Sequence, residues 1–346
     1  MNGIRYRVLG GLAWVGGALL LLAATGCAEK EPSGQGGDAA TSVPGRIEHV
    51  GSYSFQGGVL EDKDLSGIAC ISPTRGLIGA DEGAAVQVVA LSREDRTLRV
   101  LATVSLLGSS EEMDIEAIAA EGDCYYIVGS HGVAKNSGVR QPSRYTICRL
   151  RVDPTTGLPA GGEAAVTVGS LAAILERDAT LKPHFARPLQ QKGVNIEGLA
   201  IREGRLYVGL RNPNLDGYAF VLEVAADDVF AKATQPAHTL HRLWLGKGLG
   251  IREIVTAEKG FLLIAGNAGS EPSNAHPKTE DYQERRGYEL FRWPGVGPEV
   301  EKIGSLSNPP GKAEAMTILE EGPDHTTVLV LFDGPKGGAP SVYRLQ

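Results

Sequence analysis

The segment DIEAIAAEGDCYYIVGSHG, residues 114–132, contains the pattern that decides the fold. Two short apolar runs stand on either side of a tight turn. A polar residue lies at the start of the first run, and a glycine-flanked polar cluster ends the second. Such runs are typical of two paired strands, and antiparallel pairing brings the start of one strand beside the end of the other. The segment therefore predicts a β-hairpin with polar residues gathered at one end.

The same pattern occurs five times along the chain. Two further strand-like runs follow each of the first four copies, so each copy predicts a four-stranded antiparallel meander, at a spacing that fits propeller blades. Residues 171–185, LAAILERDATLKPHF, interrupt the alternation and predict a helical insertion. The five copies are LSGIAC (65–70) with GLIGADEG (76–83), IEAIAA (115–120) with YYIVGSHG (125–132), IEGLAI (196–201) with LYVGLRNP (206–213), IREIVT (251–256) with FLLIAGNAG (261–269), and AEAMTI (313–318) with TVLVLFDGP (327–335).

The two ends of the repeat complement each other. Only one run, SVYRLQ (341–346), follows the last copy, whereas RIEHVGSYSF (46–55) is a strand-like segment before the first copy. Pairing between these segments completes the last blade and removes the sheet edges that an open ring would expose. The expected fold is all-β: a five-bladed β-propeller of four-stranded antiparallel blades, closed by the N- and C-terminal strands, with six blades as the alternative.

The composition agrees with this fold and argues against one class of partner. With 42% hydrophobic and 22% charged residues, the chain is typical of a soluble globular protein with a sizeable core. Forty-six glycines and only 6% aromatic residues favour many tight turns between short strands. The formal charge of -7 argues against a nucleic-acid partner.

The amino-terminal residues predict export. In residues 1–26, Arg5 and Arg7 precede an apolar run that ends in small residues, which is the pattern of a signal peptide. Together with Cys27, this pattern resembles the lipobox of bacterial lipoproteins, in which a diacylglycerol is attached to the cysteine. The resemblance implies a membrane partner through lipid on Cys27; an uncleaved membrane anchor is the alternative.

Residues 27–45 predict a flexible tether, because they have no apolar period and many small or polar side chains. Residues 46–346 then form a single propeller domain. Ala28 replaces the Asp that retains lipoproteins in the inner membrane of well-studied Gram-negative bacteria. The expected location is therefore the bacterial cell envelope, at the outer membrane and facing the periplasm.

The repeat motifs resemble those of a bacterial propeller family, the domain-of-unknown-function family 3616. More distantly, the strand pattern Glu-Gly/Ala-hydrophobic-Ala is similar to that of propellers related to phytases, including esterase-like ones. The second resemblance implies a calcium-dependent phosphoester or ester hydrolase as one alternative activity. The residues that carry the first resemblance are DIEAIA (114–119) with GSHG (129–132), NIEGLA (195–200) with GLRNP (209–213), GIREI (250–254), and AEAMT (313–317) with FDG (332–334).

Three glutamates of the repeat are predicted to meet at one mouth of the central channel. Glu116, Glu197 and Glu314 occupy the same repeat position as Ser66 and Arg252. Like charges this close either raise a pKa or are held by a cation, and calcium or magnesium is the natural candidate. Acidic side chains could instead accept backbone N–H bonds from a neighbouring blade and lock the ring.

Further polar residues are predicted at the same mouth. Arg211, Arg252, Asp81 and Asp333 are candidate ligand contacts, and the arginines suit a phosphate or carboxylate held beside a metal. His131 is the histidine that lies inside a repeat motif, so it is a candidate general base or metal ligand. A hydrogen-bonded histidine that caps a strand is the alternative.

The remaining motifs exclude several classes of enzyme. The chain has no G-x-S-x-G elbow, H-E-x-x-H pair or P-loop, so serine-esterase, zinc-protease and nucleotide-binding functions lose their usual support. Besides Cys27, three cysteines remain. Cys70 and Cys124 are predicted near the opposite mouth and are the candidate pair for a disulfide, whereas Cys148 is expected to be a buried small apolar residue.

Two functional hypotheses follow. The first is an envelope lipoprotein propeller that binds a cation, and additionally an anionic small molecule, at one mouth. The second is a non-catalytic scaffold that binds proteins through its rim loops, with the acidic ring serving only to lock the blades.

Overall fold

The computed structural model describes residues 47–346 except 109–110, 136 and 285. The predicted signal peptide, the lipidation site Cys27 and the tether lie outside the described residues. Within the described ranges, no helix has both the length and the apolar character needed to span a membrane.

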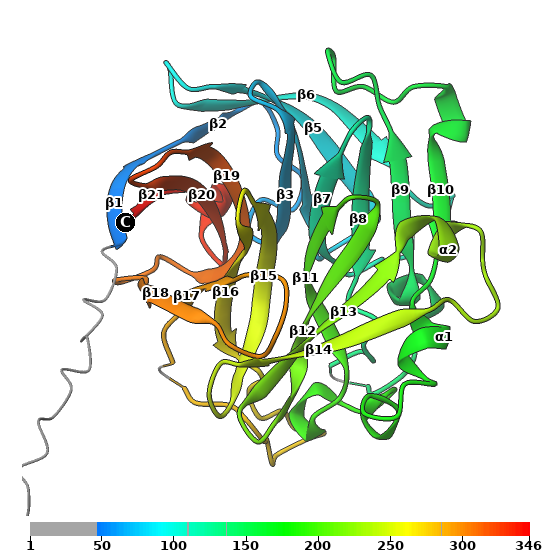
Figure 1. Cartoon of the computed structure of the whole chain (residues 1–346). Coiled ribbons are helices and arrows are strands. Elements are labelled where there is room, and N and C mark those ends of the chain that lie inside the picture. Colours follow the sequence, from blue (N-terminus) through cyan, green and yellow to red (C-terminus); the bar gives the residue numbers. More distant parts are fainter. Residues whose placement is uncertain (1–46, 109–110, 136, 285) are drawn as a thin grey trace, which may run out of the picture. The chain divides into compact units, whose positions relative to one another are not determined.

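Five antiparallel blades follow one another around a central axis, as predicted (Figure 1). Each of the five sequence copies forms the first two strands of one blade. Blade one contains β3 (Leu65–Ser72), β4 (Arg75–Ala80), β5 (Ala85–Ser92) and β6 (Thr97–Ser105). Blade two contains β7 (Ile115–Glu121), β8 (Cys124–Gly129), β9 (Ile147–Arg151) and β10 (Val166–Gly169). Blade three contains β11 (Asn195–Arg202), β12 (Arg205–Leu215), β13 (Tyr218–Ala225) and β14 (His238–Trp244). Blade four contains β15 (Leu249–Ala257), β16 (Gly260–Asn267), β17 (Glu289–Trp293) and β18 (Glu301–Ser305).

Blade five joins the two ends of the described chain. It contains β19 (Lys312–Glu321), β20 (Thr326–Asp333) and β21 (Ser341–Leu345), and β1 (Ile47–Ser52) pairs with β21 as its outer strand. The predicted closure is thereby confirmed. The next segment, β2 (Ser54–Gln56), adds to blade one by parallel pairing with β6, so the amino-terminal strands link the last blade to the first.

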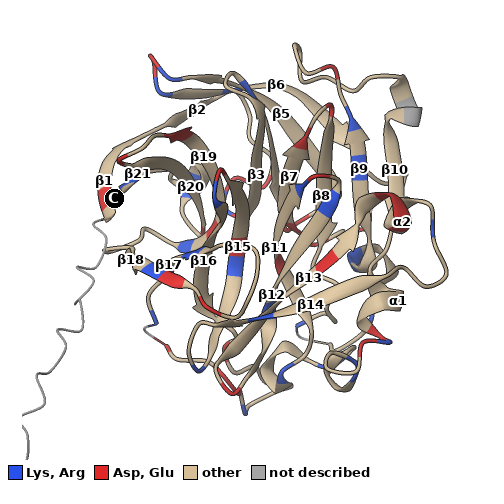
Figure 2. Ribbon diagram, in the orientation of Figure 1, with Lys and Arg blue, Asp and Glu red and all other residues tan. Residues whose placement is uncertain are grey.

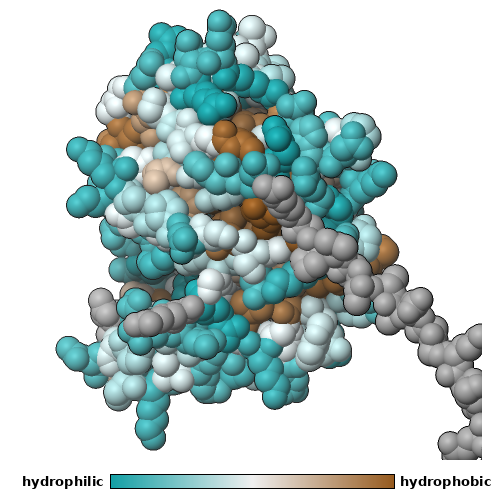
Figure 3. Space-filling view, turned by 90° about the vertical axis from the view of Figure 1, so that its left-hand side faces the viewer, coloured by the Kyte–Doolittle hydropathy of each residue, from teal (hydrophilic) through white to brown (hydrophobic). Residues whose placement is uncertain are grey.

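The apolar core lies between the blades. In the described residues it divides into five clusters, and each fills the space between the facing sides of two neighbouring blades. One cluster joins blades five and one through Leu331 and Ile78, so the ring is closed by packing as well as by strand pairing. The outer surface is mostly hydrophilic in the view of Figure 3, with scattered apolar patches. Acidic and basic residues are scattered over the ribbon in Figure 2.

The insertion predicted over residues 171–185 is only partly helical. It contains a short α-helix, α1 (Ala172–Leu175), and a 3₁₀ turn over Lys182–His184, followed by another over Leu189–Gln191. Pro183 and Pro188 lack the N–H groups that a continuous helix needs. The apolar residues of the insertion cover the end of the core between blades two and three. The second short helix, α2 (Ala226–Phe230), follows β13, and the remaining 3₁₀ turns are Pro142–Tyr145, Gly162–Ala165 and Lys336–Gly338.

The cysteine prediction needs a correction. Cys70, Cys124 and Cys148 are all free thiols in the described chain. Cys70 packs in the core between blades five and one, whereas Cys124 packs against the core between blades two and three, so the expected disulfide does not form. Cys148 is fully buried on β9, as expected of a small apolar residue.

Candidate binding pocket

The polar residue of each repeat occupies a β-bulge. In all five blades the pairing between the first and second strands skips one residue close to the start of the first strand. A bulge leaves the extra residue outside the ladder and redirects its side chain. The skipped residues are those of the predicted ring: Ser66, Glu116, Glu197, Arg252 and Glu314.

Four of these five residues bind the neighbouring blades together. Ser66 Oγ donates a hydrogen bond to the carbonyl of Ile115 in the next blade. Arg252 lies between Glu197 of blade three and Glu314 of blade five: its Nη1 is 2.7 Å from Glu197 Oε2, and its Nη2 bonds Glu314 Oε1. Arg252 and Glu197 are each only 3% exposed. The triad locks three blades, which is the structural role that the sequence left open.

Glu116 differs from its four equivalents. Among the described residues it has no hydrogen-bond or ion-pair partner, although it lies on the same bulge in β7. Its pKa is raised well above the ordinary value, first by burial and then by the neighbouring carboxylates of Glu197, Asp114, Glu314 and Asp81. Glu116 is thus the one member of the ring that structural contacts leave available.

Another glutamate performs the locking that was expected of the ring. In four blades a small residue follows the bulge: Gly67, Ala117, Gly198 and Ala315. At Gly67 a Cβ atom would lie 2.7 Å from Ile118 Cγ1 of the next blade, which explains the small side chain. Blade four has Glu253 instead, and its Oε1 accepts the N–H groups of Leu199 at 3.3 Å and Ile254 at 2.8 Å. Burial raises the pKa of this carboxyl.

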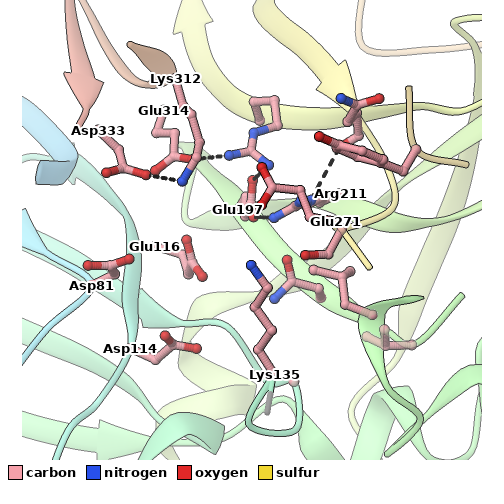
Figure 4. Close-up of a pocket in the computed structure, with 18 of the residues that line it drawn as sticks. Asp81, Asp114, Glu116, Lys135, Glu197, Arg211, Glu271, Lys312, Glu314 and Asp333 are labelled. Carbon is pink, nitrogen blue, oxygen red and sulfur yellow. Dashed lines mark hydrogen bonds and ion pairs between the residues drawn. The ribbon is translucent and has the colours of Figure 1, made fainter. Parts of the chain in front are cut away.

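A cavity of about 350 Å³ opens at the mouth where the innermost strands begin. Charged and amide side chains form most of its wall, and Figure 4 shows Asp81, Asp114 and Glu116 on one side with Arg211 and Glu271 on the other. The opposite mouth, where the same strands end, is lined mainly by apolar residues such as Ile118 and Met316. The two ends of the channel therefore differ sharply in polarity.

The acidic side of the cavity is short of positive charge. Asp81 follows β4, has no side-chain partner among the described residues, and buries its Oδ1 atom. Burial, together with the charges of Glu314, Asp114 and Asp333, raises the pKa of Asp81 to about 8. Burial also raises the pKa of Asp114 to about 6, against the opposing effect of Arg144, whose Nη1 lies 2.8 Å from Asp114 Oδ2.

The predicted anion contacts line the cavity but are already engaged. Arg211 donates to Glu197 Oε1 at 2.6 Å and to the carbonyls of Asn267, Ala268 and Gly269. Arg252 is held by the two glutamates described above, and Asp333 pairs with Lys312. Arg211 and Arg252 therefore stabilise the ring and the loop after β16. Arg252 keeps an unpartnered Nε atom, but this atom is buried.

His131 lies outside the cavity lining and is fully buried. Its Nδ1 is 3.0 Å from the carbonyl of Gly129, and its Nε2 accepts the N–H of Leu171 at 3.1 Å. Burial lowers the pKa of the imidazole to about 4, so the ring is neutral with both nitrogens engaged. This is the alternative structural arrangement considered for His131.

The three glutamates do not form a ready metal site. Glu197 and Glu314 share Arg252, so Glu116 has no second unpaired glutamate from the ring beside it. In the described ranges, no three His, Cys, Asp or Glu side chains are grouped as metal ligands. Calcium or magnesium binding stays a prediction.

Several pocket residues were not among the sequence candidates. Lys135, Arg187 and Arg286 lie on loops that reach over the mouth, and Tyr288 stands beside the triad. Loop residues have no repeat equivalent, so no periodic signal marks them. The bulge positions, in contrast, could be found because a polar residue next to a small one recurs in four blades.

Together, the closed ring and its charged pocket define the class of this protein as a five-bladed β-propeller with one polar channel mouth. The chain matches the family described as "Protein of unknown function (DUF3616)" over residues 64–152 and 163–339, and it belongs to that family. This confirms the resemblance found in the repeat motifs. No curated protein matches the sequence.

Several solved structures are similar to this chain at low identity. A Bacteroides uniformis protein provisionally named a 6-phosphogluconolactonase has 13% identity and a TM-score of 0.42, with 84% of this chain and 85% of that chain covered. A Bacteroides thetaiotaomicron protein of unknown function has 12% identity, a TM-score of 0.40 and coverages of 87% and 76%. An engineered GH43 glycoside hydrolase has 10% identity and a TM-score of 0.44, and this chain matches 52% of its length. Likeness at this level carries no information about activity.

Proposed function

We propose that this propeller binds a cation in its polar mouth, with Glu116 and Asp81 as the direct contacts. The observation that carries the proposal is the exception in the ring: four bulge residues are used between blades, and Glu116 faces the cavity without a partner. Asp81 stands beside it, also unpaired. Two carboxylates that lack a counter-ion in a partly enclosed space favour a ligand that supplies positive charge.

The location and anchoring of the protein are part of this proposal. A lipid on Cys27 and a tether over residues 27–45 would hold the propeller at the bacterial outer membrane, where the pocket samples periplasmic solutes. The signal-like segment 1–26 supports this location. Processing can be tested by mass spectrometry of the mature protein, and a Cys27→Ser variant that still partitions with membranes would overturn lipid anchoring.

Binding can be measured by isothermal titration calorimetry on the 46–346 fragment with calcium, magnesium and butylamine as separate probes. At least one probe should bind the wild type and bind Glu116→Gln about tenfold or more weakly, because an amide carries no charge. Glu121→Gln is the matched control, since this glutamate lies at the other end of the same strand and accepts the N–H of Gly204 at 2.9 Å. Equal affinity in wild type and Glu116→Gln would overturn the proposal.

The same fragment serves to test the alternatives. Turnover of a nitrophenyl ester or nitrophenyl phosphate, lost in Glu116→Gln, would support the hydrolase implied by the phytase-like resemblance. No binding of any probe and no turnover would leave the scaffold hypothesis.

A further inference from the structure

The charges that line the pocket fall into two sets. In the first set each side chain has an oppositely charged partner, as in the triad of Arg252 and the pairs Arg144–Asp114 and Lys312–Asp333. The second set has no such partner among the described residues. It contains Asp81 and Glu116 at the channel strands and, on the loops over the mouth, Lys135, Arg187, Glu271, Glu284 and Arg286.

The unpaired charges are separated by depth. Asp81 and Glu116 are half-buried at the ends of the strands of blades one and two. Lys135 is exposed on the loop after β8, and Figure 4 shows its side chain extending into the pocket from the edge. The pocket therefore has a positive side chain at its edge and two carboxyl groups deeper inside.

Lys135 is the basic side chain of the pocket lining that has neither a hydrogen-bond nor an ion-pair partner among the described residues. Arg211 and Arg252 already pair with the glutamates of the ring. Arg286 is tied by a hydrogen bond to the carbonyl of Lys247 at 3.0 Å, and Arg187 reaches only the carbonyl of Pro183 at 3.5 Å. Glu271 lies on the Arg211 side of the pocket in Figure 4, away from the acidic pair.

The acidic pair suits an ammonium group. An ammonium has three donors and can be held by two or three acceptors, whereas calcium takes six to eight oxygen ligands. Asp81 and Glu116 supply two carboxyl groups, and a bound ammonium would favour their ionised forms. The described residues hold no group of three metal-ligating side chains.

We propose that the ligand is a zwitterion of the amino-acid class, with its ammonium group on Asp81 and Glu116 and its carboxylate on Lys135. This inference rests on the proposed cation binding and adds to it the identity of the cation and a second contact. The polar wall agrees with it, because a small zwitterion has little apolar surface to bury.

Calorimetry with matched compounds tests this. Glycine, 4-aminobutanoate and 6-aminohexanoate are each compared with the amine of the same carbon count, and the series covers different separations of the two charges. At least one amino acid should bind about tenfold or more tightly than its amine. In Lys135→Ala that advantage should disappear, while the amine should bind at least as tightly because a neighbouring positive charge has been removed.

Lys135 lies on an exposed loop, so its removal should leave the fold intact, and circular dichroism verifies this. Lys259→Ala, at an exposed turn between β15 and β16, is the matched control and should retain the advantage. If no amino acid binds more tightly than its amine, the zwitterion is wrong although amine binding stands. If the advantage survives in Lys135→Ala, the carboxylate contact assigned to Lys135 is wrong. If only calcium or magnesium binds, the zwitterion again fails while cation binding stands, and if nothing binds, both proposals fail.

Discussion

Glu116 in blade two and the triad of blades three to five occupy equivalent bulges yet have opposite surroundings. Glu197, Arg252 and Glu314 form a buried chain of alternating charge, whereas Glu116 faces a cavity with acidic neighbours. The β-bulge is the same in both cases. What differs is whether a neighbouring blade supplies a basic side chain, and this difference separates the part of the ring that holds the blades from the part available to a ligand.

The largest expected effect comes from breaking the triad. Arg252→Leu leaves Glu197 and Glu314 buried without their shared cation and should destabilise the fold by about 3–5 kcal/mol. Urea unfolding followed by tryptophan fluorescence measures the change. The control is Arg292→Leu, because Arg292 makes an exposed pair with Glu301 at 3.7 Å and should cost about 1 kcal/mol or less. Equal losses in the two variants would mean that the triad does not hold the ring.

The second expected effect is a pH dependence of the unfolding free energy that arises from Asp81, on the acidic wall of the pocket. The pKa of Asp81 is raised to about 8 by folding, so the folded state holds this proton more tightly than the unfolded chain does. The stabilisation is complete below the unfolded pKa of about 4 and is lost as pH rises toward about 8, by up to about 1.4 kcal/mol per pH unit.

Asp81→Asn should therefore flatten the fall in unfolding free energy between about pH 5 and pH 8. Denaturant unfolding at several pH values measures both slopes. Glu223→Gln is a useful contrast, since hydrogen bonds from His241 and Arg205 lower the pKa of Glu223. A wild-type curve that rises with pH over this range, or an unchanged slope in Asp81→Asn, would contradict the assignment.

A smaller loss of stability is expected from removing the contact that Ser66 makes between blades one and two. Ser66 Oγ is buried and donates to the carbonyl of Ile115, so Ser66→Ala removes one contact between blades and should cost about 1 kcal/mol. Thermal unfolding detects such a change. A neutral result would show that the bulge in blade one holds its neighbour through packing alone.

The smallest expected change is Glu116→Gln at about pH 5, where the unfolding free energy should change by less than about 0.5 kcal/mol. Burial raises the pKa of the Glu116 carboxyl well above its ordinary value, so acidic pH favours the neutral form, and the amide that replaces it has a similar size and no charge. A loss comparable to that of Arg252→Leu would show that Glu116 also locks the ring, and it would remove the basis of the comparison.

The sequence predicted the ring of polar residues but not their partners. Periodicity reveals that Ser66, Glu116, Glu197, Arg252 and Glu314 are equivalent, because every blade repeats the same hairpin. It does not reveal that Arg252 reaches both flanking glutamates, since this depends on the spacing of three blades. Lys135 and Arg286 were missed for a related reason: they lie on loops, which repeat neither in length nor in composition.

Glu253 and the cysteines show the same limit. A glutamate one position after the bulge has no counterpart in the other blades, so the repeat pattern gave no reason to select the residue that bonds the backbone of blade three. Cys70 and Cys124 lie near one mouth in the linear scheme, but the strands direct them into different cores.

The amino-acid sequence by itself determined the hairpin in each blade and the closure of the ring by the terminal strands, and it favoured five blades over six. These features depend on apolar alternation and turns within short segments, and a chain carries such local information directly. Only the tertiary structure decided which charges neutralise one another and which remain open to the cavity. Ion pairing depends on distances between side chains that are far apart in sequence, and these distances exist only once the blades have packed.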